Sequence, residues 1–168
     1  MDTIFALASA PGKAGISIVR LSGPLAINVA EKLTKSKLKE KQPNLRVIYD
    51  SDNQFIDQAL ILIFSKPCSF TGENVVEFHL HGSSAVVSSV IKLLGNFKGL
   101  RSAEAGEFTR CALENGKIDL AQVEGLADLI DAETDAQHKQ AVRIFNGALG
   151  EKTKEWRAKL VKAGALLV

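Results

Sequence analysis

The sequence predicts an α+β protein, with an N-terminal α/β domain over residues 1–118 and long helices over residues 119–168. Two patterns lead to this prediction. Runs rich in β-branched residues alternate with short helical patterns before residue 118, and helical periodicity alone follows it. The composition, 46% apolar and 24% charged over 168 residues, is ordinary for a globular protein and excludes collagen-like, low-complexity and wholly disordered chains.

The strands and helices of the first domain are predicted from local patterns. Five runs of β-branched or alternating apolar residues are predicted strands, at residues 4–8, 16–21, 47–49, 55–64 and 75–81. Asp52-Asn53, between the third run and the fourth, predicts a hairpin. Three segments are predicted helices: one that begins near Pro24 with Leu25, Val29 and Leu33 on one face, one at residues 85–94, and one at residues 107–114 that ends at Asn115-Gly116.

The second region is predicted to be helical almost to its end. One apolar stripe, with Asp119 in the first turn of its helix, consists of Leu120, Val123, Ala127 and Ile130. A second stripe has nearly heptad spacing and consists of Leu149, Trp156, Leu160, Ala163 and Leu167. Glu155 is placed to pair with Lys159 one helical turn later.

Charges and the apolar end also characterise this region. Residues 119–135 carry six acids and no base, while residues 139–162 carry seven bases and two acids. This segregation is typical of solvated helix faces. The last four residues, Ala165-Leu166-Leu167-Val168, are apolar and uncapped. We therefore expect that the helical domain is incomplete or that a partner covers this end.

Several classes of site find no support in the sequence. Gly12-Lys13 is followed by Ala14, where a Walker A loop needs Ser or Thr, so the chain is predicted neither to bind GTP tightly nor to hydrolyse it. Cys68 and Cys111 lie far apart, and no disulfide framework or CxxC metal pair follows from them.

The longest apolar run, residues 59–64, is far shorter than a membrane span. A net charge of +2 is too small to indicate nucleic-acid binding by the whole chain. We expect a cytoplasmic protein without membrane association.

One predicted strand has a polar and an apolar face. Its polar face carries Glu77, His79 and His81, and its apolar face carries Val76, Phe78 and Leu80. Two interpretations stay open: a half-exposed strand that meets water, or a ligand-binding wall whose carboxylate accepts two parallel N–H groups from a flat heterocycle.

Two basic residues outside this strand are further candidates. Arg20 interrupts another apolar strand, and a charge in such a run usually lies at an edge or is paired in a site. Lys117 is a single charge at a turn. No residue is assigned a catalytic role, and two neighbouring histidines do not predict a metal site.

Four motifs, in order, resemble the MnmE (TrmE) family of tRNA-modification GTPases. They are A-P-G-K-A-G-I-S-I-V-R-L-S-G at residues 10–23, S-F-T-G-E-N-V-V-E at 69–77 followed by His81-Gly82, G-E-F-T-R at 106–110, and N-G-K-I-D-L-A-Q at 115–122 followed by A-D-L-I-D-A at 127–132. The resemblance covers nearly the whole chain. It implies an N-terminal domain similar to the folate-binding domains of the glycine-cleavage T-protein type.

The resemblance also implies a domain order. In the family, a helical domain follows the N-terminal domain and is interrupted by an inserted GTPase domain. This chain would stop before that insertion, so GTP, Mg²⁺ and K⁺ would belong to the missing GTPase domain.

The resemblance further implies a ligand and partners. A 5-formyl-tetrahydrofolate site would form across a homodimer of N-terminal domains, with Arg20, Glu77 and Lys117 as its contacts. The complete proteins act with the flavoprotein MnmG (GidA) to install an aminomethyl or carboxymethylaminomethyl group on the wobble uridine of tRNA, and the folate supplies the one-carbon unit. Two alternatives stay open: a dimerisation module that has lost its ligand, and an RNA-binding module that uses residues 32–46 and the basic helix.

Overall fold

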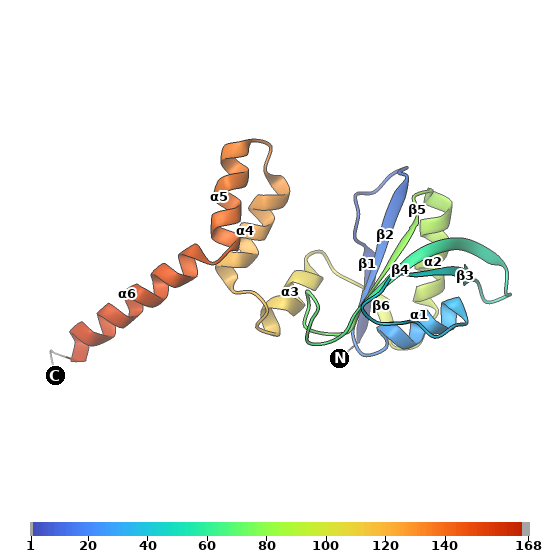
Figure 1. Ribbon diagram of the computed structural model, residues 1–168, viewed down its shortest axis with the longest axis horizontal. Coiled ribbons are helices and arrows are strands. Elements are labelled where there is room, and N and C mark those ends of the chain that lie inside the picture. The colour runs from blue at the N-terminus through green and yellow to red at the C-terminus, as the bar shows by residue number, and fades with distance from the viewer. Residues whose placement is uncertain (1, 166–168) are drawn as a thin grey trace. The chain divides into compact units, whose positions relative to one another are not determined.

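The computed structural model describes residues 2–165 and is a mixed α+β structure, as the sequence predicts (Figure 1). The chain divides between Ala112 and Leu113 into two compact units, called unit 1 and unit 2. Unit 1 holds β1 (Thr3–Leu7), β2 (Ile16–Ser22), α1 (Ala26–Thr34), β3 (Asn44–Tyr49), β4 (Phe55–Phe64), β5 (Val75–His81), α2 (Ser84–Gly95), β6 (Leu100–Ser102) and most of α3 (Glu107–Glu114). Unit 2 holds α4 (Leu120–Asp131), α5 (Asp135–Phe145) and α6 (Ala148–Ala165).

The six strands form one sheet in the order β3-β4-β5-β2-β1-β6. All neighbours pair antiparallel except β1 and β6, which are parallel. The predicted hairpin is confirmed, because β3 pairs with β4 and Asn53 in the turn adopts a φ of +64°. The sequence does not predict β6, since its three residues form no alternating run and its partner β1 is distant in the chain.

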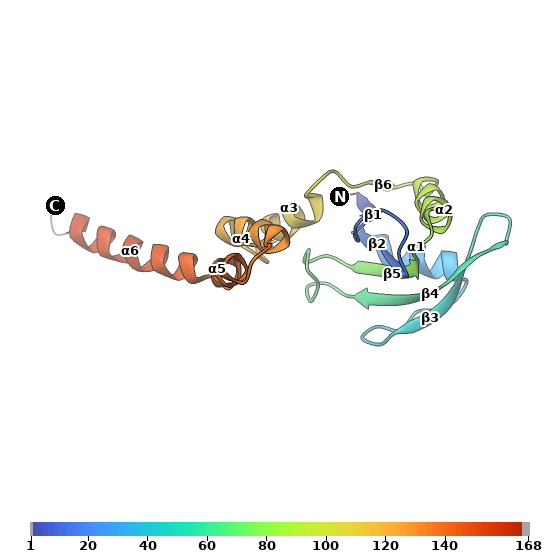
Figure 2. The ribbon, with the colours of Figure 1, turned by 90° about the horizontal axis from the view of Figure 1, so that it is seen from above.

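The two faces of the sheet differ. Alternate residues of its central strands, such as Val19, Ile61 and Phe78, are fully buried together with residues of α1 and α2. Figure 2 shows these two helices beside the strands. The predicted division of β5 is confirmed, since Val76, Phe78 and Leu80 are buried while Glu77, His79 and His81 are partly or fully exposed.

The start of α1 differs from the prediction. The helix begins at Ala26, with Leu25 at its N-cap, rather than near Pro24. Val29 and Leu33 are buried as predicted, whereas Leu25 is 37% exposed. The turn before the helix contains Gly23, which has a φ of +134° and lies so close to Thr3 that a Cβ atom would be 2.7 Å from the Thr3 Cα.

Unit 2 is helical as predicted, with a break that the periodicity does not show. Thr134 forms a capping box with Gln137 and starts α5 as a separate helix. Asp119 is the N-cap of α4 and forms a capping box with Gln122, so it precedes the first turn rather than lying in it. The predicted pair of Glu155 and Lys159 is confirmed at 2.7 Å.

The predicted apolar stripes of unit 2 are not buried by the described residues. Leu120 is 64% and Ile130 75% exposed, and Gly125 is the buried residue of α4 instead. A Cβ atom on Gly125 would lie 2.8 Å from the Phe145 nitrogen, so α4 and α5 approach each other closely there. Leu167 and most of the apolar end lie outside the described residues. Among the described helices, none has the length and hydropathy needed to cross a membrane.

Candidate functional site

Arg20 and Glu77 form an ion pair on the face of the sheet opposite α1 and α2. They are directly opposed in the β2–β5 register. The Arg20 Nε atom donates to Glu77 Oε1 at 2.8 Å, and Nη2 lies 2.8 Å from the same oxygen. The side chains are only 28% and 14% exposed, so the pair is partly desolvated. Of the two positions expected for this charge, a sheet edge or an ion pair in a site, the structure shows the ion pair, since β2 lies inside the sheet.

Two aromatic rings flank the guanidinium group. The Arg20 Cζ atom lies 6.0 Å from the centroid of the Phe70 ring and 5.5 Å from that of Phe108. These distances fit cation–π contacts, and with the ion pair they restrict Arg20 to one place. No local sequence pattern predicts a role for either ring, although both lie in motifs that carry the family resemblance. The only available signal was therefore that resemblance.

Polar contacts fix the loop that carries Phe70. The Ser22 hydroxyl is hydrogen-bonded to Thr71 Oγ1 at 2.7 Å and donates to Glu73 Oε2 at 3.0 Å. The Ser69 hydroxyl donates to the Glu73 carbonyl. Since Ser22 ends β2 two residues after Arg20, the strand that carries the arginine also holds the loop beside it.

A buried carboxylate fixes the helix that carries Phe108. Glu107 begins α3, is 4% exposed, and accepts hydrogen bonds from both Arg101 and Arg110. The Arg101 guanidinium, as the main cause, lowers the pKa of Glu107 from 4.5 to about 2, while burial acts in the opposite direction. The carboxylate therefore stays ionised at neutral pH.

The two histidines of β5 have different surroundings. His81 is exposed, and its Nδ1 atom lies 2.7 Å from the buried Asp57 Oδ1. His79 Nε2 is buried and has no hydrogen-bond partner among the described residues, although it lies 3.5 Å from Glu77 Oε2. An unpaired buried nitrogen is costly, so its position beside Glu77 indicates a place for a polar ligand group. The described residues contain no cluster of three His, Cys, Asp or Glu side chains that could hold a metal ion.

The chemistry of the site follows from the oxygens of Glu77. Both nearby Arg20 nitrogens approach Oε1, and a carboxylate oxygen accepts about two hydrogen bonds. Oε2 keeps acceptor capacity beside His79. A flat ligand with two neighbouring N–H groups could bind at this oxygen while Arg20 holds the carboxylate in place.

Lys117, the third predicted contact, is an exposed residue of unit 2 that follows Gly116, whose φ is +64°. The structure thus brings together two of the three predicted site residues, Arg20 and Glu77. The role of Lys117 stays a prediction.

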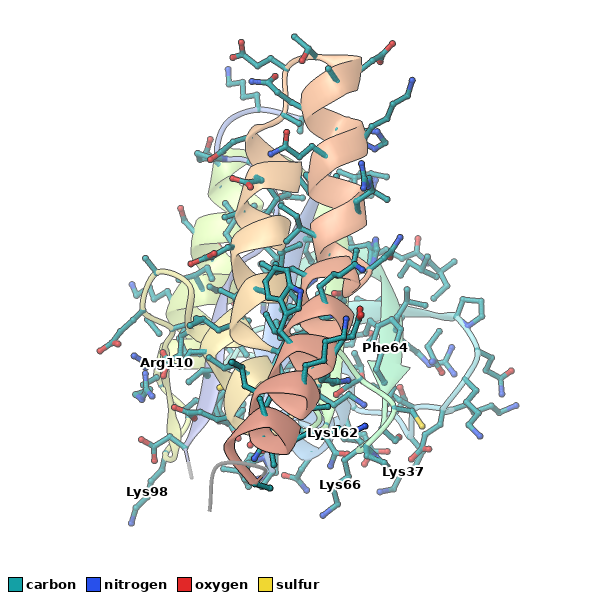
Figure 3. All side chains as sticks on the ribbon, turned by 90° about the vertical axis from the view of Figure 1, so that its left-hand side faces the viewer. Lys37, Phe64, Lys66, Lys98, Arg110 and Lys162 are labelled. Atoms are coloured by element: carbon teal, nitrogen blue, oxygen red, sulfur yellow. The ribbon has the colours of Figure 1, made fainter. Side chains whose placement is uncertain are left out.

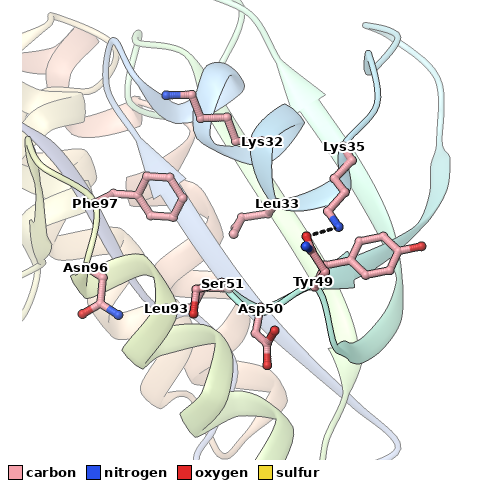
Figure 4. Close-up of a pocket in the computed structure, with 10 residues that line it drawn as sticks. Lys32, Leu33, Lys35, Tyr49, Asp50, Ser51, Leu93, Asn96 and Phe97 are labelled. Carbon is pink, nitrogen blue, oxygen red and sulfur yellow. Dashed lines mark hydrogen bonds between the residues drawn. The ribbon is translucent and has the colours of Figure 1, made fainter.

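A separate cavity of about 310 Å³ lies between the ends of α1 and α2 and the β3–β4 turn (Figure 4). It includes Lys32 and Lys35 from the segment considered for RNA binding. The Lys35 ammonium already donates to Asn53 and lies 4.2 Å from the centroid of the Tyr49 ring. Because these contacts engage the Lys35 ammonium, this cavity is a weaker candidate than the Arg20–Glu77 pair.

The fold and the site define an α+β domain that carries a partly buried ion pair on one face of its sheet and is followed by helices. Comparison with known proteins identifies it further: the family described as the GTP-binding protein TrmE N-terminus matches residues 3–117, and the MnmE helical domain matches residues 120–168. The chain belongs to this TrmE/MnmE family.

Close relatives carry the same family name. A protein of Roseobacter denitrificans named tRNA modification GTPase MnmE is 60% identical over 167 residues, and similarly named proteins of Ruegeria pomeroyi and Cereibacter sphaeroides are 56% identical. Each alignment covers 99% of this chain and 39% of the relative. The chain therefore spans about two fifths of the length of these curated relatives.

Proposed function

We propose that this chain is the folate-binding part of a tRNA modification GTPase and that Glu77 binds the pteridine ring of 5-formyl-tetrahydrofolate. The observation that carries the proposal is the Arg20–Glu77 pair, fixed in a partly buried position with acceptor capacity left on Oε2. The names of the relatives support the role in tRNA modification.

The chemistry of the ligand fits the residues that surround Glu77. A pteridine presents a ring N–H and an amino group side by side, and a carboxylate accepts such a pair. The His79 Nε2 atom, 3.5 Å from Glu77 Oε2 and without a hydrogen-bond partner among the described residues, would gain one from a ligand heteroatom. Lys117 is proposed as a further contact with the anionic ligand, on the strength of the family resemblance.

We extend the proposal to the assembly and its partners. The sheet face that carries Glu77 also exposes apolar side chains, namely Ile16, Leu45, Leu60 and Phe64. Such a surface suits a second copy of the chain, so we propose that the site is shared in a homodimer. The complete protein would act in the cytoplasm with MnmG on the tRNA wobble uridine, and GTP hydrolysis would belong to a domain outside these residues.

Titration calorimetry with 5-formyl-tetrahydrofolate tests the ligand. We expect the chain to bind it and Glu77→Gln to lose about 2–4 kcal/mol, roughly thirtyfold to a thousandfold in affinity, because two ligand N–H groups lose an acceptor in a desolvated place. Arg20→Lys should lose less, since it keeps a charge near Glu77 but not the planar fork. The matched control is Glu31→Gln, which alters a carboxylate of α1 that is paired with Lys37, and it should keep the wild-type affinity. Wild-type affinity in Glu77→Gln would refute the proposal.

Sedimentation velocity tests the dimer. At tens of micromolar the chain should sediment as a dimer, and Leu60→Glu should shift it to monomer because a charge enters the apolar face. Leu160→Glu, on the exposed surface of α6, is the control and should stay dimeric. A wild-type chain that is monomeric at this concentration contradicts the shared site.

A further inference from the structure

A cavity of about 410 Å³ lies at the C-terminal end of β4. Its walls come from the end of that strand, from the loop that follows it and from the segment before β3. The lining residues are Lys41, Gln42, Pro43, Leu62, Ile63, Phe64, Ser65, Lys66 and Cys68.

The cavity adjoins the Glu77 site through one strand. Leu62, which lines the cavity, is directly opposite Glu77 in the β4–β5 register. Neighbouring strands are about 4.8 Å apart, so a ligand at Glu77 reaches the cavity by crossing a single strand. Phe64 projects from the same strand and is 38% exposed, which offers an aromatic surface along this path (Figure 3).

The polar groups of the cavity are mainly donors. Lys41 and Lys66 are both exposed cations, and the described residues that line the cavity include no acidic side chain. The Ser65 hydroxyl, also in the lining, is a buried atom without a hydrogen-bond partner among the described residues. Buried hydroxyls are nearly always paired, so this one indicates a place for an acceptor.

The Glu77 site and the cavity therefore suit ligand groups of opposite kinds. Glu77 offers acceptor oxygens, which suit the N–H groups of a pteridine, whereas the cavity offers two ammonium groups and a hydroxyl, which suit carboxylates. A folate has these groups at its two ends, joined by an aromatic ring. This arrangement fixes the direction in which the ligand would lie.

We propose that this cavity binds the carboxylate-bearing tail of the folate and that it favours a tail of several γ-linked glutamates; the inference rests on the folate site proposed above. The pteridine lies at Glu77, the aromatic ring passes Leu62 and Phe64, and the glutamates meet Lys41 and Lys66. Each added glutamate brings one more carboxylate to these lysines.

Calorimetry with the monoglutamate and the triglutamate of 5-formyl-tetrahydrofolate tests the inference on the full chain. The triglutamate should bind roughly fivefold to tenfold more tightly, because it adds two carboxylates near exposed cations, and added salt should reduce this ratio. The double variant Lys41→Gln/Lys66→Gln should bring the ratio close to one. Lys37→Gln, which alters a lysine of the same surface outside the cavity, should keep it (Figure 3).

The outcomes separate the two proposals. If the monoglutamate binds with the expected Glu77 dependence but the ratio is one in the wild type, or survives in the double variant, the tail site is wrong and the folate site stands. If neither form binds, both fail. Tri-γ-glutamate without a pteridine is a third titrant, and binding as tight as that of the triglutamyl folate would assign the cavity to free acidic peptides and overturn the inference.

Cys68 provides an independent readout in the folded wild type. Its thiol is exposed and lines the cavity, whereas Cys111 lies in α3 outside it. At saturation, the triglutamate should slow alkylation of Cys68 by iodoacetamide several-fold more than the monoglutamate does. The rate at Cys111 should be the same with the two ligands. Equal protection of Cys68 by both forms would contradict the inference.

Discussion

Unit 1 and unit 2 differ in how far their apolar side chains are buried. In unit 1, both faces of the central strands are used: one packs against α1 and α2 and buries residues such as Phe78 and Leu21 completely, and the other presents Arg20 and Glu77. In unit 2, only Gly125 and Ala141 are buried among the described residues, while Trp156 and Leu160 are more than half exposed. Unit 1 thus has a core that can hold a site in place, and unit 2 depends on caps and one close helix contact.

The largest expected change in the free energy of unfolding follows from removing a core side chain. Phe78→Ala should destabilise unit 1 by about 3–5 kcal/mol, because Phe78 is fully buried at the centre of the sheet. Trp156→Ala removes a larger side chain from α6 but should change stability by less than about 0.5 kcal/mol, since that residue is 54% exposed. Urea unfolding followed by far-UV circular dichroism measures both. Similar costs for the two variants would mean that the contrast between the units is wrong.

Within unit 2, the close contact between α4 and α5 should be the sensitive point. Gly125→Ala places a Cβ atom 2.9 Å from Ile144 Cγ2 and 2.8 Å from a backbone nitrogen, so the helices must separate at a cost of about 1–3 kcal/mol. Gly164→Ala in α6 meets no atom within 4 Å and should stabilise its helix slightly. Hydrogen exchange of the α4 and α5 amides compares the two. Unchanged exchange in Gly125→Ala contradicts the packing described.

Acid should weaken unit 1 through Glu107. Its pKa is lowered from 4.5 to about 2, so the ionised carboxylate stabilises the fold above pH 4.5, and this contribution disappears as the pH falls from 4.5 toward 2. The loss is about 1–2 kcal/mol, because solvent screens the half-exposed Arg101. Melting temperatures between pH 2 and pH 7 measure it. Glu107→Gln should flatten this dependence, whereas Glu155→Gln on α6 should not, and parallel curves for the wild type and Glu107→Gln would count against the account.

The smallest of these expected losses of stability comes from removing a helix cap. Asp119→Ala removes the acceptor for the Gln122 amide at the start of α4 and should cost about 1 kcal/mol, confined to unit 2. Asp119→Asn keeps an acceptor and should cost only a few tenths. Exchange of the first α4 amides reports the difference. An equal loss in both variants would show that the charge, rather than the cap, is responsible.

Much of the fold can be predicted from the sequence where a local pattern determines it. The alternation along β5 predicts its two faces, and the lone charge in β2 predicts that Arg20 lies at a sheet edge or is paired. Pairings between distant segments leave no such pattern: β6 joins β1 across most of unit 1, and Phe70 and Phe108 meet Arg20 from separate parts of the chain. Helical periodicity likewise predicts the stripe that includes Leu120 and Ile130 but not whether anything covers it, and both side chains are exposed.

Hydrogen–deuterium exchange of the full chain with and without 5-formyl-tetrahydrofolate shows which unit holds the ligand. We expect slower exchange in residues 69–81, which contain the Phe70 loop and Glu77, and unchanged exchange in α6 (Ala148–Ala165). The same protection should be absent in Glu77→Gln at an equal ligand concentration. Unchanged exchange in residues 69–81 of the wild type at saturating ligand, or protection confined to α6, would contradict the account.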